Sequence, residues 1–138
     1  MVMVDTGFWL ALANKKDEHH ERAKSVLASI NAPLITTWPV MTETCYLLLM
    51  RINAGAQVAF IKSYETGAFK AFELSGNHAA RIHELLEKYA GLPMDLADAS
   101  LVVLAEHLGD GQILSTDVRD FSVYRWKDNK TFENLFLK

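Results

Sequence analysis

The chain has 138 residues, of which 50% are hydrophobic and 22% are charged, and this composition fits one folded domain over residues 1–138. Its net charge of −3 lacks the basic footprint of many nucleic-acid-binding proteins, although cations bound at a carboxylate site would neutralise part of that charge. No apolar run reaches the length of a membrane span, and no secretory signal is recognisable. With its single cysteine, Cys45, the chain is expected to be cytoplasmic and unattached to a membrane.

Short apolar runs alternate with longer helical patterns in the first half of the chain. The predicted elements are a strand over residues 1–5, a helix over 8–13, a helix capped by Asp17 and broken by Pro33, a strand over 34–37, a helix from Pro39 to Gly55, and a shorter helix through Val58 and Ile61.

The same alternation continues in the second half. The predicted elements are a strand over residues 68–74, a helix starting at Ser75 or Asn77 and broken at Gly91, a helix over 94–108, a strand over 112–116 and a last strand over 122–126. The tail carries Phe132, Leu135 and Phe136, which predicts that it packs against the domain. Alternating strands and helices predict the α/β class, with a mostly parallel sheet covered on both faces.

Four acidic residues, far apart in sequence, share one kind of position. Asp5 and Asp117 close two apolar runs, and Glu43 and Asp98 lie near the starts of two apolar helical patterns. Ligands of open parallel sheets bind outside the carboxyl ends of the strands, so these four acids are predicted to gather at one edge. Without a cation, they would raise one another's pKa values.

Four carboxylates offer hard oxygen ligands and no soft ones. This donor set favours Mg²⁺ or Mn²⁺ over zinc. Such ions lower the pKa of a bound water and stabilise the charge of a phosphoryl group during its displacement. The pattern therefore predicts a metal-dependent hydrolase acting on phosphoryl groups.

At this point the sequence resembles the PIN-domain family, in its small single-domain form that includes the VapC-like toxins. The matching segments, in the order of the family, are Val4-Asp5-Thr6-Gly7, Thr42-Glu43-Thr44, Asp95 to Leu101 and Ser115 to Phe121. The resemblance implies a three-layer α/β/α sandwich with a central sheet of four or five strands. It also implies a ribonuclease that uses Mg²⁺ or Mn²⁺, as the toxin of a type II toxin–antitoxin pair.

The resemblance also assigns roles to residues. Asp5 and Asp98 would be the main metal ligands, whereas Glu43 and Asp117 would bind through water, hold a second ion or orient the nucleophile. The supporting residues that it implies are Thr6, Thr116, Asp95 and Asp120. For Asp95, capping its own helix is the favoured interpretation, and Asp120 is either close to the site or simply exposed.

Other residues have an ordinary interpretation beside a functional one. The tract Asp17-Glu18-His19-His20 is better explained as a helix start than as a metal site, since adjacent histidines do not share a helix face. Cys45 is interpreted as a small hydrophobe rather than a nucleophile. The aromatic residues Phe8, Trp9 and Trp38 are candidates to stack on bases, but packing or a dimer contact is the favoured interpretation.

Seven basic residues are candidates to contact an RNA backbone, and solvated surface is the favoured interpretation for any one of them. They are Lys15, Lys16, Arg22, Arg51, Arg119, Arg125 and Lys127. Arg119 is the best candidate for RNA binding because it flanks Asp117.

Three functions compete at this level. The leading one is the metal-dependent endoribonuclease, with RNA as substrate, a possible antitoxin partner and a homodimer formed by the apolar helices after Pro39 and Gly55. The second is a non-catalytic PIN-like module that binds RNA or protein. The third is a phosphoaspartate or haloacid-dehalogenase-like enzyme, which is disfavoured because no lysine follows the late strand and Gly7 stands where a second acid is needed.

Overall fold

A single parallel sheet organises the computed structural model, which describes residues 1–138. Its five strands lie in the order β3-β2-β1-β4-β7, and every neighbouring pair is parallel. They are β1 (Val2–Val4), β2 (Leu34–Thr37), β3 (Lys70–Phe72), β4 (Gln112–Leu114) and β7 (Glu133–Asn134). Strands β5 (Arg125–Trp126) and β6 (Lys130–Thr131) form a separate antiparallel hairpin.

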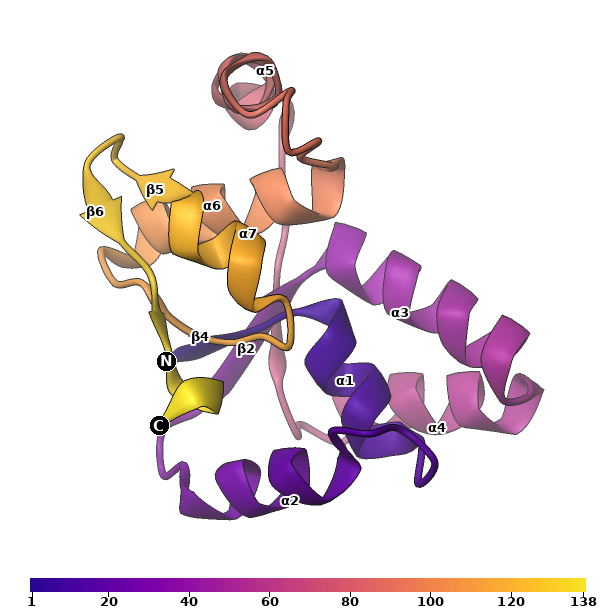
Figure 1. Ribbon diagram of the computed structural model, residues 1–138. Coiled ribbons are helices and arrows are strands. Elements are labelled where there is room, and N and C mark those ends of the chain that lie inside the picture. Colours follow the sequence, from indigo (N-terminus) through magenta and orange to yellow (C-terminus); the bar gives the residue numbers. More distant parts are fainter.

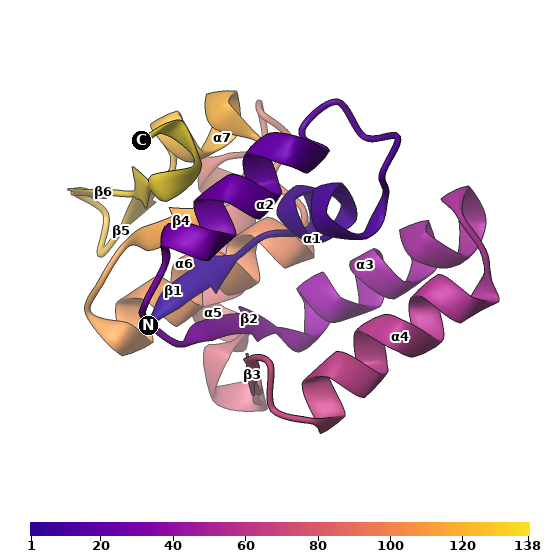
Figure 2. The same ribbon diagram turned by 90° about the horizontal axis from the view of Figure 1, so that it is seen from below.

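Helices cover both faces of this sheet, as expected for a three-layer α/β/α arrangement. They are α1 (Thr6–Ala13), α2 (His20–Ser29), α3 (Trp38–Arg51), α4 (Ala54–Glu65), α5 (Ala79–Lys88), α6 (Leu96–Leu108) and α7 (Val118–Val123), with short 3-10 turns η1 (Gly76–His78) and η2 (Leu135–Leu137). Helices α1 and α2 lie on one face and α5 and α6 on the other, whereas α3 and α4 extend to one side of the sheet (Figures 1 and 2). None of the helices combines the length and apolar character needed to cross a membrane.

The core lies where the central strands meet α1 and α6. All three residues of β1 are buried, because a central strand of a parallel sheet is covered on both sides. Eight of the thirteen residues of α6 are buried, so this helix is enclosed on most of its circumference. Asp5, which follows β1, and Asp98, in α6, are therefore attached to closely packed elements of the core.

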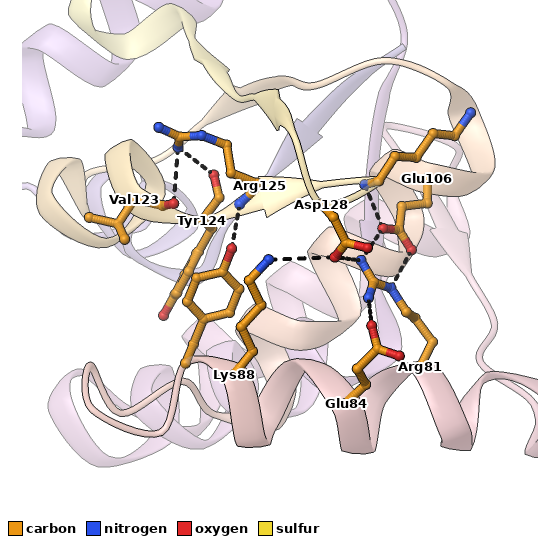
Figure 3. A network of polar contacts seen from close by, with 10 residues as sticks. Arg81, Glu84, Lys88, Glu106, Val123, Tyr124, Arg125 and Asp128 are labelled. Atoms are coloured by element: carbon orange, nitrogen blue, oxygen red, sulfur yellow. Dashed lines mark hydrogen bonds and ion pairs between the residues drawn. The ribbon is translucent and has the colours of Figure 1, made fainter.

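A cluster of five charged side chains joins α5, α6 and the β5–β6 hairpin. This Arg81 cluster consists of Arg81, Glu84, Lys88, Glu106 and Asp128 (Figure 3). Arg81 donates from Nε to Glu106 Oε1 at 3.0 Å and from Nη2 to Glu106 Oε2 at 2.6 Å. It also pairs with Glu84 and donates to Asp128 at 3.0 Å. Each acid of the cluster thus has a cation beside it.

Three sequence-based element predictions are wrong. Asp17 does not cap a helix, because α2 starts at His20 and Asp17 accepts the His19 N–H at 2.8 Å in the preceding turn. Gly55 does not end α3, which stops at Arg51; Asn53 caps α4, and Gly55 lies in the first turn of α4.

The third wrong prediction is the strand over residues 122–126. Residues Val118–Val123 form α7, and only Arg125 and Trp126 are a strand. The helix forms because Asp117 caps it by accepting the Asp120 N–H at 3.1 Å. Strand β7 was not predicted, because its two residues are too few to show a period.

Candidate functional site

One acidic cavity lies at the carboxyl ends of β1 and β4. Its volume is about 480 Å³, and it brings all four predicted acids together. The residues that line it are Asp5, Thr6, Gly7, Leu10, Glu43, Leu47, Arg51, Leu92, Pro93, Asp95, Asp98, Thr116, Asp117, Arg119 and Asp120. All four supporting residues named from the sequence are among them. The cavity is therefore built from segments that span most of the chain.

Asp5 occupies the floor of the acidic cavity and is buried. It follows β1 directly and caps α1, so its position is fixed by a central strand on one side and a helix start on the other. Its Oδ1 accepts the Thr6 N–H at 2.8 Å, and its Oδ2 accepts the Ser115 hydroxyl at 3.0 Å. Two donors from different strand ends thus hold this carboxylate in one orientation.

Glu43 enters the cavity from α3, which starts directly after β2. The Thr6 hydroxyl donates to Glu43 Oε1 at 2.6 Å. Because Thr6 also donates its backbone N–H to Asp5, one residue holds two of the four acids. Thr6 therefore links the carboxylates of Asp5 and Glu43.

Asp98 lies in the first turn of α6. Asp95 caps this helix by accepting the Asp98 N–H at 2.8 Å, and the Asp95 N–H lies 3.5 Å from Asp98 Oδ2. The Tyr124 hydroxyl donates to the same oxygen at 3.1 Å. The predicted cap at Asp95 is thus confirmed, and Asp95 also lines the cavity.

Asp117 caps α7 and completes the four. Its Oδ1 accepts the Asp120 N–H at 3.1 Å, and its own N–H donates to the Ser115 hydroxyl at 2.9 Å. Close packing sets this loop against α1: a Cβ at Gly7 would lie 2.1 Å from Thr116 Oγ1. A side chain at position 7 would therefore displace the Thr116 hydroxyl from its present position beside the acids.

Three of the four acids keep one carboxylate oxygen free of protein donors. No hydrogen bond from the protein reaches Glu43 Oε2, Asp98 Oδ1 or Asp117 Oδ2, whereas the second oxygen of each acid accepts at least one. A donor on one oxygen orients a carboxylate and leaves the other for a ligand. This is the arrangement expected of a site that binds cations.

The electrostatics of the cavity oppose its own ionisation. Burial raises the pKa of Asp5 to about 6, although the Thr6 N–H and the Ser115 hydroxyl lower it. Burial and the neighbouring Asp95 and Asp5 raise the pKa of Asp98 to about 8. Burial also raises the pKa of Asp117. When they ionise, the acids carry a negative charge that the surrounding protein does not balance.

The donor set fits a hard divalent cation. All candidate ligands are carboxylate oxygens, and a cation would remove the penalty that raises the pKa values of Asp5 and Asp98. No three His, Cys, Asp or Glu side chains are drawn together closely enough to enclose an ion by themselves. This suits Mg²⁺, which takes one or two carboxylates and completes its shell with water and substrate oxygens.

Two cations lie at the rim of the acidic cavity. Arg119 donates to Asp120 at 3.1 Å and is largely exposed. Arg51, in the last turn of α3, forms no ion pair and no side-chain hydrogen bond within the protein. Two of the other basic candidates bind backbone carbonyls instead: Arg22 donates to the Phe136 carbonyl at 2.9 Å, and Arg125 donates to the Ser122 carbonyl at 2.9 Å. The backbone N–H of Lys127 donates to Glu106 at 2.7 Å.

Sequence reasoning missed three residues that support the acids: Ser115, Tyr124 and Asn134. Ser115 joins Asp5 to Asp117 and is itself fixed by Asn134, which accepts its N–H at 3.2 Å and donates to its carbonyl at 2.9 Å. Tyr124 contacts Asp98 across 26 residues of sequence. Only the position of Ser115 at a strand end offered a signal.

The remaining candidates are structural. His20 is buried against the Ala11 carbonyl at 2.7 Å, so the two histidines form no metal site. Phe8 and Trp9 are buried in the core, whereas Trp38 is 39% exposed. Cys45 is half-buried, and burial raises the pKa of its thiol, which argues against a nucleophile.

Comparisons with known proteins agree with this geometry. The family model of the PIN domain matches residues 2–127. Ribonuclease VapC26 of Mycobacterium tuberculosis is 29% identical over 127 residues, which make up 90% of this chain and 92% of that protein. The 23S rRNA-specific endonuclease VapC20 of the same species is 42% identical over 59 residues, 43% of this chain and 45% of that protein.

A solved structure extends the likeness to the fold. The crystal structure of M. tuberculosis VapC20, described as a sarcin-ricin loop cleaving toxin, matches with a TM-score of 0.79 and 25% sequence identity. The match covers 85% of this chain and 90% of that chain.

Proposed function

The chain belongs to the PIN-domain family, and on this premise we propose that it is a metal-dependent endoribonuclease that hydrolyses RNA phosphodiester bonds. One observation carries the proposal: four carboxylates from four separate elements line one cavity, and donors from the protein orient each of them. A non-catalytic binding module has no need for four buried or half-buried acids held in this way.

The proposed roles follow from burial and hydrogen bonding. Asp5 and Asp98 bind the cation directly, because burial raises the pKa of both carboxyl groups and a bound ion would relieve that cost. Asp98 keeps Oδ1 free, and each oxygen of Asp5 accepts a single hydrogen bond, which leaves a lone pair for the ion. Glu43 and Asp117 bind through water, hold a second ion or orient the attacking water. A bound Mg²⁺ or Mn²⁺ supplies an activated water and stabilises the phosphoryl charge. Thr6 and Ser115 keep the carboxylates in place.

The relatives suggest the biological setting. Because the similar proteins are a ribonuclease and a 23S rRNA-specific endonuclease described as a toxin, we extend an RNA substrate and a toxin role to this chain. A toxin of this kind requires a cognate antitoxin protein, so we include an antitoxin among its partners.

Cleavage of RNA in the presence and absence of metal tests the proposal. We expect cleavage with about 5 mM Mg²⁺ or Mn²⁺, a concentration above the roughly millimolar Kd of the weakest oxygen-ligand sites, and none in excess EDTA. Asp98→Asn should lose on the order of 10³-fold in kcat, because removing a metal ligand forfeits several kcal/mol of charge stabilisation. Glu84→Gln, which removes an acid of the Arg81 cluster, is the matched control and should retain activity. Undiminished cleavage in EDTA contradicts the proposal, and metal binding without any cleavage supports the binding module instead.

We also propose a homodimer formed through α3 and α4. Large apolar side chains are exposed on both of these helices. Because monomeric proteins rarely expose a large apolar patch, this surface indicates a protein–protein contact. They are Tyr46, Leu49, Met50, Val58 and Ile61. Light scattering should give twice the mass of the chain, and Met50→Glu should shift it toward the monomer. A monomeric wild-type protein at working concentration contradicts the proposal.

A further inference from the structure

Tyr124 connects two of the acids that the cavity gathers. Its side chain is fully buried, and its hydroxyl donates to Asp98 Oδ2 at 3.1 Å. Tyr124 directly follows α7, and Asp117 caps the start of the same helix. One short helix therefore fixes Asp117 at one end and reaches Asp98 from the other.

Three groups hold Tyr124 in this place. Its ring packs edge-to-face against Tyr89 and Phe121, with ring centroids 5.0 Å and 5.2 Å away. The Arg125 guanidinium donates to the carbonyls of Val123 at 2.9 Å and Tyr124 at 3.0 Å, and the Arg125 N–H donates to the Tyr89 hydroxyl at 3.0 Å (Figure 3). The hydroxyl therefore has little freedom to leave Asp98 while α7 remains folded.

The kind of donor matters as much as its position. A lysine or arginine at this point would bring a positive charge that neutralises Asp98 and competes with a cation. A phenol donates a hydrogen bond without a charge, so it orients the carboxylate and leaves its charge available. Both protein donors to Asp98 fall on Oδ2, and Oδ1 accepts none.

We propose that Tyr124 is a positioning residue of the cavity, which fixes Asp98 Oδ2 so that Oδ1 is presented to the cation. This inference rests on the proposed metal-dependent function. The alternative is that Asp98 only accepts the hydrogen bond that the buried Tyr124 hydroxyl needs as part of the core. The two differ in their consequence for metal binding, because a packing role leaves the affinity for a cation unchanged.

Calorimetric titration of the full chain with Mn²⁺ tests the inference. Tyr124→Phe keeps the ring and its contacts but removes the donor, so Mn²⁺ binding should weaken about 10- to 100-fold, the usual loss when the support of a metal ligand is removed. Tyr64→Phe is the matched control: Tyr64 packs against Trp38 and Phe69, its hydroxyl forms no hydrogen bond in the protein, and its loss should leave the affinity unchanged.

A double-variant cycle separates the hydroxyl from any effect on packing. In an Asp98→Asn background, Tyr124→Phe should cause less than about a twofold further loss of Mn²⁺ affinity, because the hydroxyl acts through Asp98. An equal loss in both backgrounds, or wild-type affinity in Tyr124→Phe, overturns the inference. A wild-type chain that binds no Mn²⁺ overturns the proposed function itself, and so the two failures are distinguishable.

Discussion

The acidic cavity and the Arg81 cluster both gather charged side chains at the junction of several elements, yet they are built in opposite ways. In the Arg81 cluster, the glutamates and Asp128 each lie beside Arg81, and Lys88 adds a second cation (Figure 3). In the acidic cavity, Asp5, Glu43 and Asp98 have only neutral donors. One region balances its charge internally, and the other leaves it for a ligand.

The pKa shifts of the two regions express this difference. The hydrogen bond from Arg81 lowers the pKa of Asp128. The hydrogen bond to Glu106 raises the pKa of Arg81. In the cavity, burial raises the pKa values of Asp5 and Asp98 to about 6 and about 8. Acids of the same type therefore stabilise the fold in one place and oppose it in the other.

The first prediction concerns pH and metal together. A carboxyl group whose pKa is raised on folding binds a proton more tightly in the folded state, so stability falls as pH rises from the unfolded value near 3.8 toward the folded value of about 8. In EDTA, the melting temperature should therefore fall between pH 5 and pH 8. Mg²⁺ at one fixed concentration, about 100 times its Kd at pH 8, should raise the melting temperature by ~8 °C at pH 8. The same concentration should raise it by less at pH 5, because protons compete for the carboxylates. The melting temperatures are measured by differential scanning calorimetry. An equal rise on adding Mg²⁺ at both pH values would contradict the view that the acidic cavity leaves its charge for a cation.

The second prediction removes the central cation of the balanced region. Arg81→Met leaves Glu106, whose side chain is 18% exposed, without a cation and with only the Lys127 N–H as a donor. Loss of one member of a half-buried pair should cost about 2 kcal/mol, between the values for exposed and buried pairs, or ~6 °C in melting temperature. Mn²⁺ affinity at 15 °C (roughly 40 °C below a typical mesophilic melting point) should stay within about twofold of the wild type. A large loss of affinity would show that the two regions are coupled.

The division between these regions was only partly predictable from the sequence. The acids of the cavity were recognisable because each follows a strand or lies in the first two turns of a helix, and the order of strands and helices places such positions at one edge. The Arg81 cluster gave no such signal. Its partners Glu106 and Asp128 lie 25 and 47 residues from Arg81 in sequence, and only tertiary packing brings them together.

The same limit explains the errors in the elements and in the supporting residues. Helix α7 has six residues and β7 has two, so neither shows a hydrophobic period. An available signal was overlooked at α7, since Asp117 and Asp120 have the spacing of a helix cap. Tyr124 and Asn134 were not predictable. They follow or belong to α7 and β7, the elements that the sequence pattern did not reveal, and only those elements place them beside Asp98 and Ser115.

The third prediction is a gain of stability, whereas the second is a loss. Asp98→Asn removes a charge that burial and neighbouring acids disfavour, so the metal-free protein should gain stability at pH 8. Because Asp98 is only partly buried, solvent screening reduces the expected gain to about 1 kcal/mol, or ~3 °C. The thermal gain on adding Mg²⁺ should shrink in the same variant. A variant that is less stable than the wild type in EDTA would mean that Asp98 stabilises the fold, as the acids of the Arg81 cluster do.

The smallest expected effect is at the rim of the cavity, where cations meet unbalanced acids. Arg119 is 78% exposed on its side chain and pairs only with the neighbouring Asp120, so its loss costs little stability. If it contacts one phosphate of a single-stranded substrate, Arg119→Ala should raise KM about threefold, with kcat unchanged, and reduce the slope of log affinity against log salt by about 0.7. Lys24→Ala removes the same charge from α2, where Lys24 pairs with Glu21, and should change neither quantity. Equal effects of the two variants would mean that only the net charge of the molecule attracts RNA, because a local contact distinguishes Arg119 from any other surface cation.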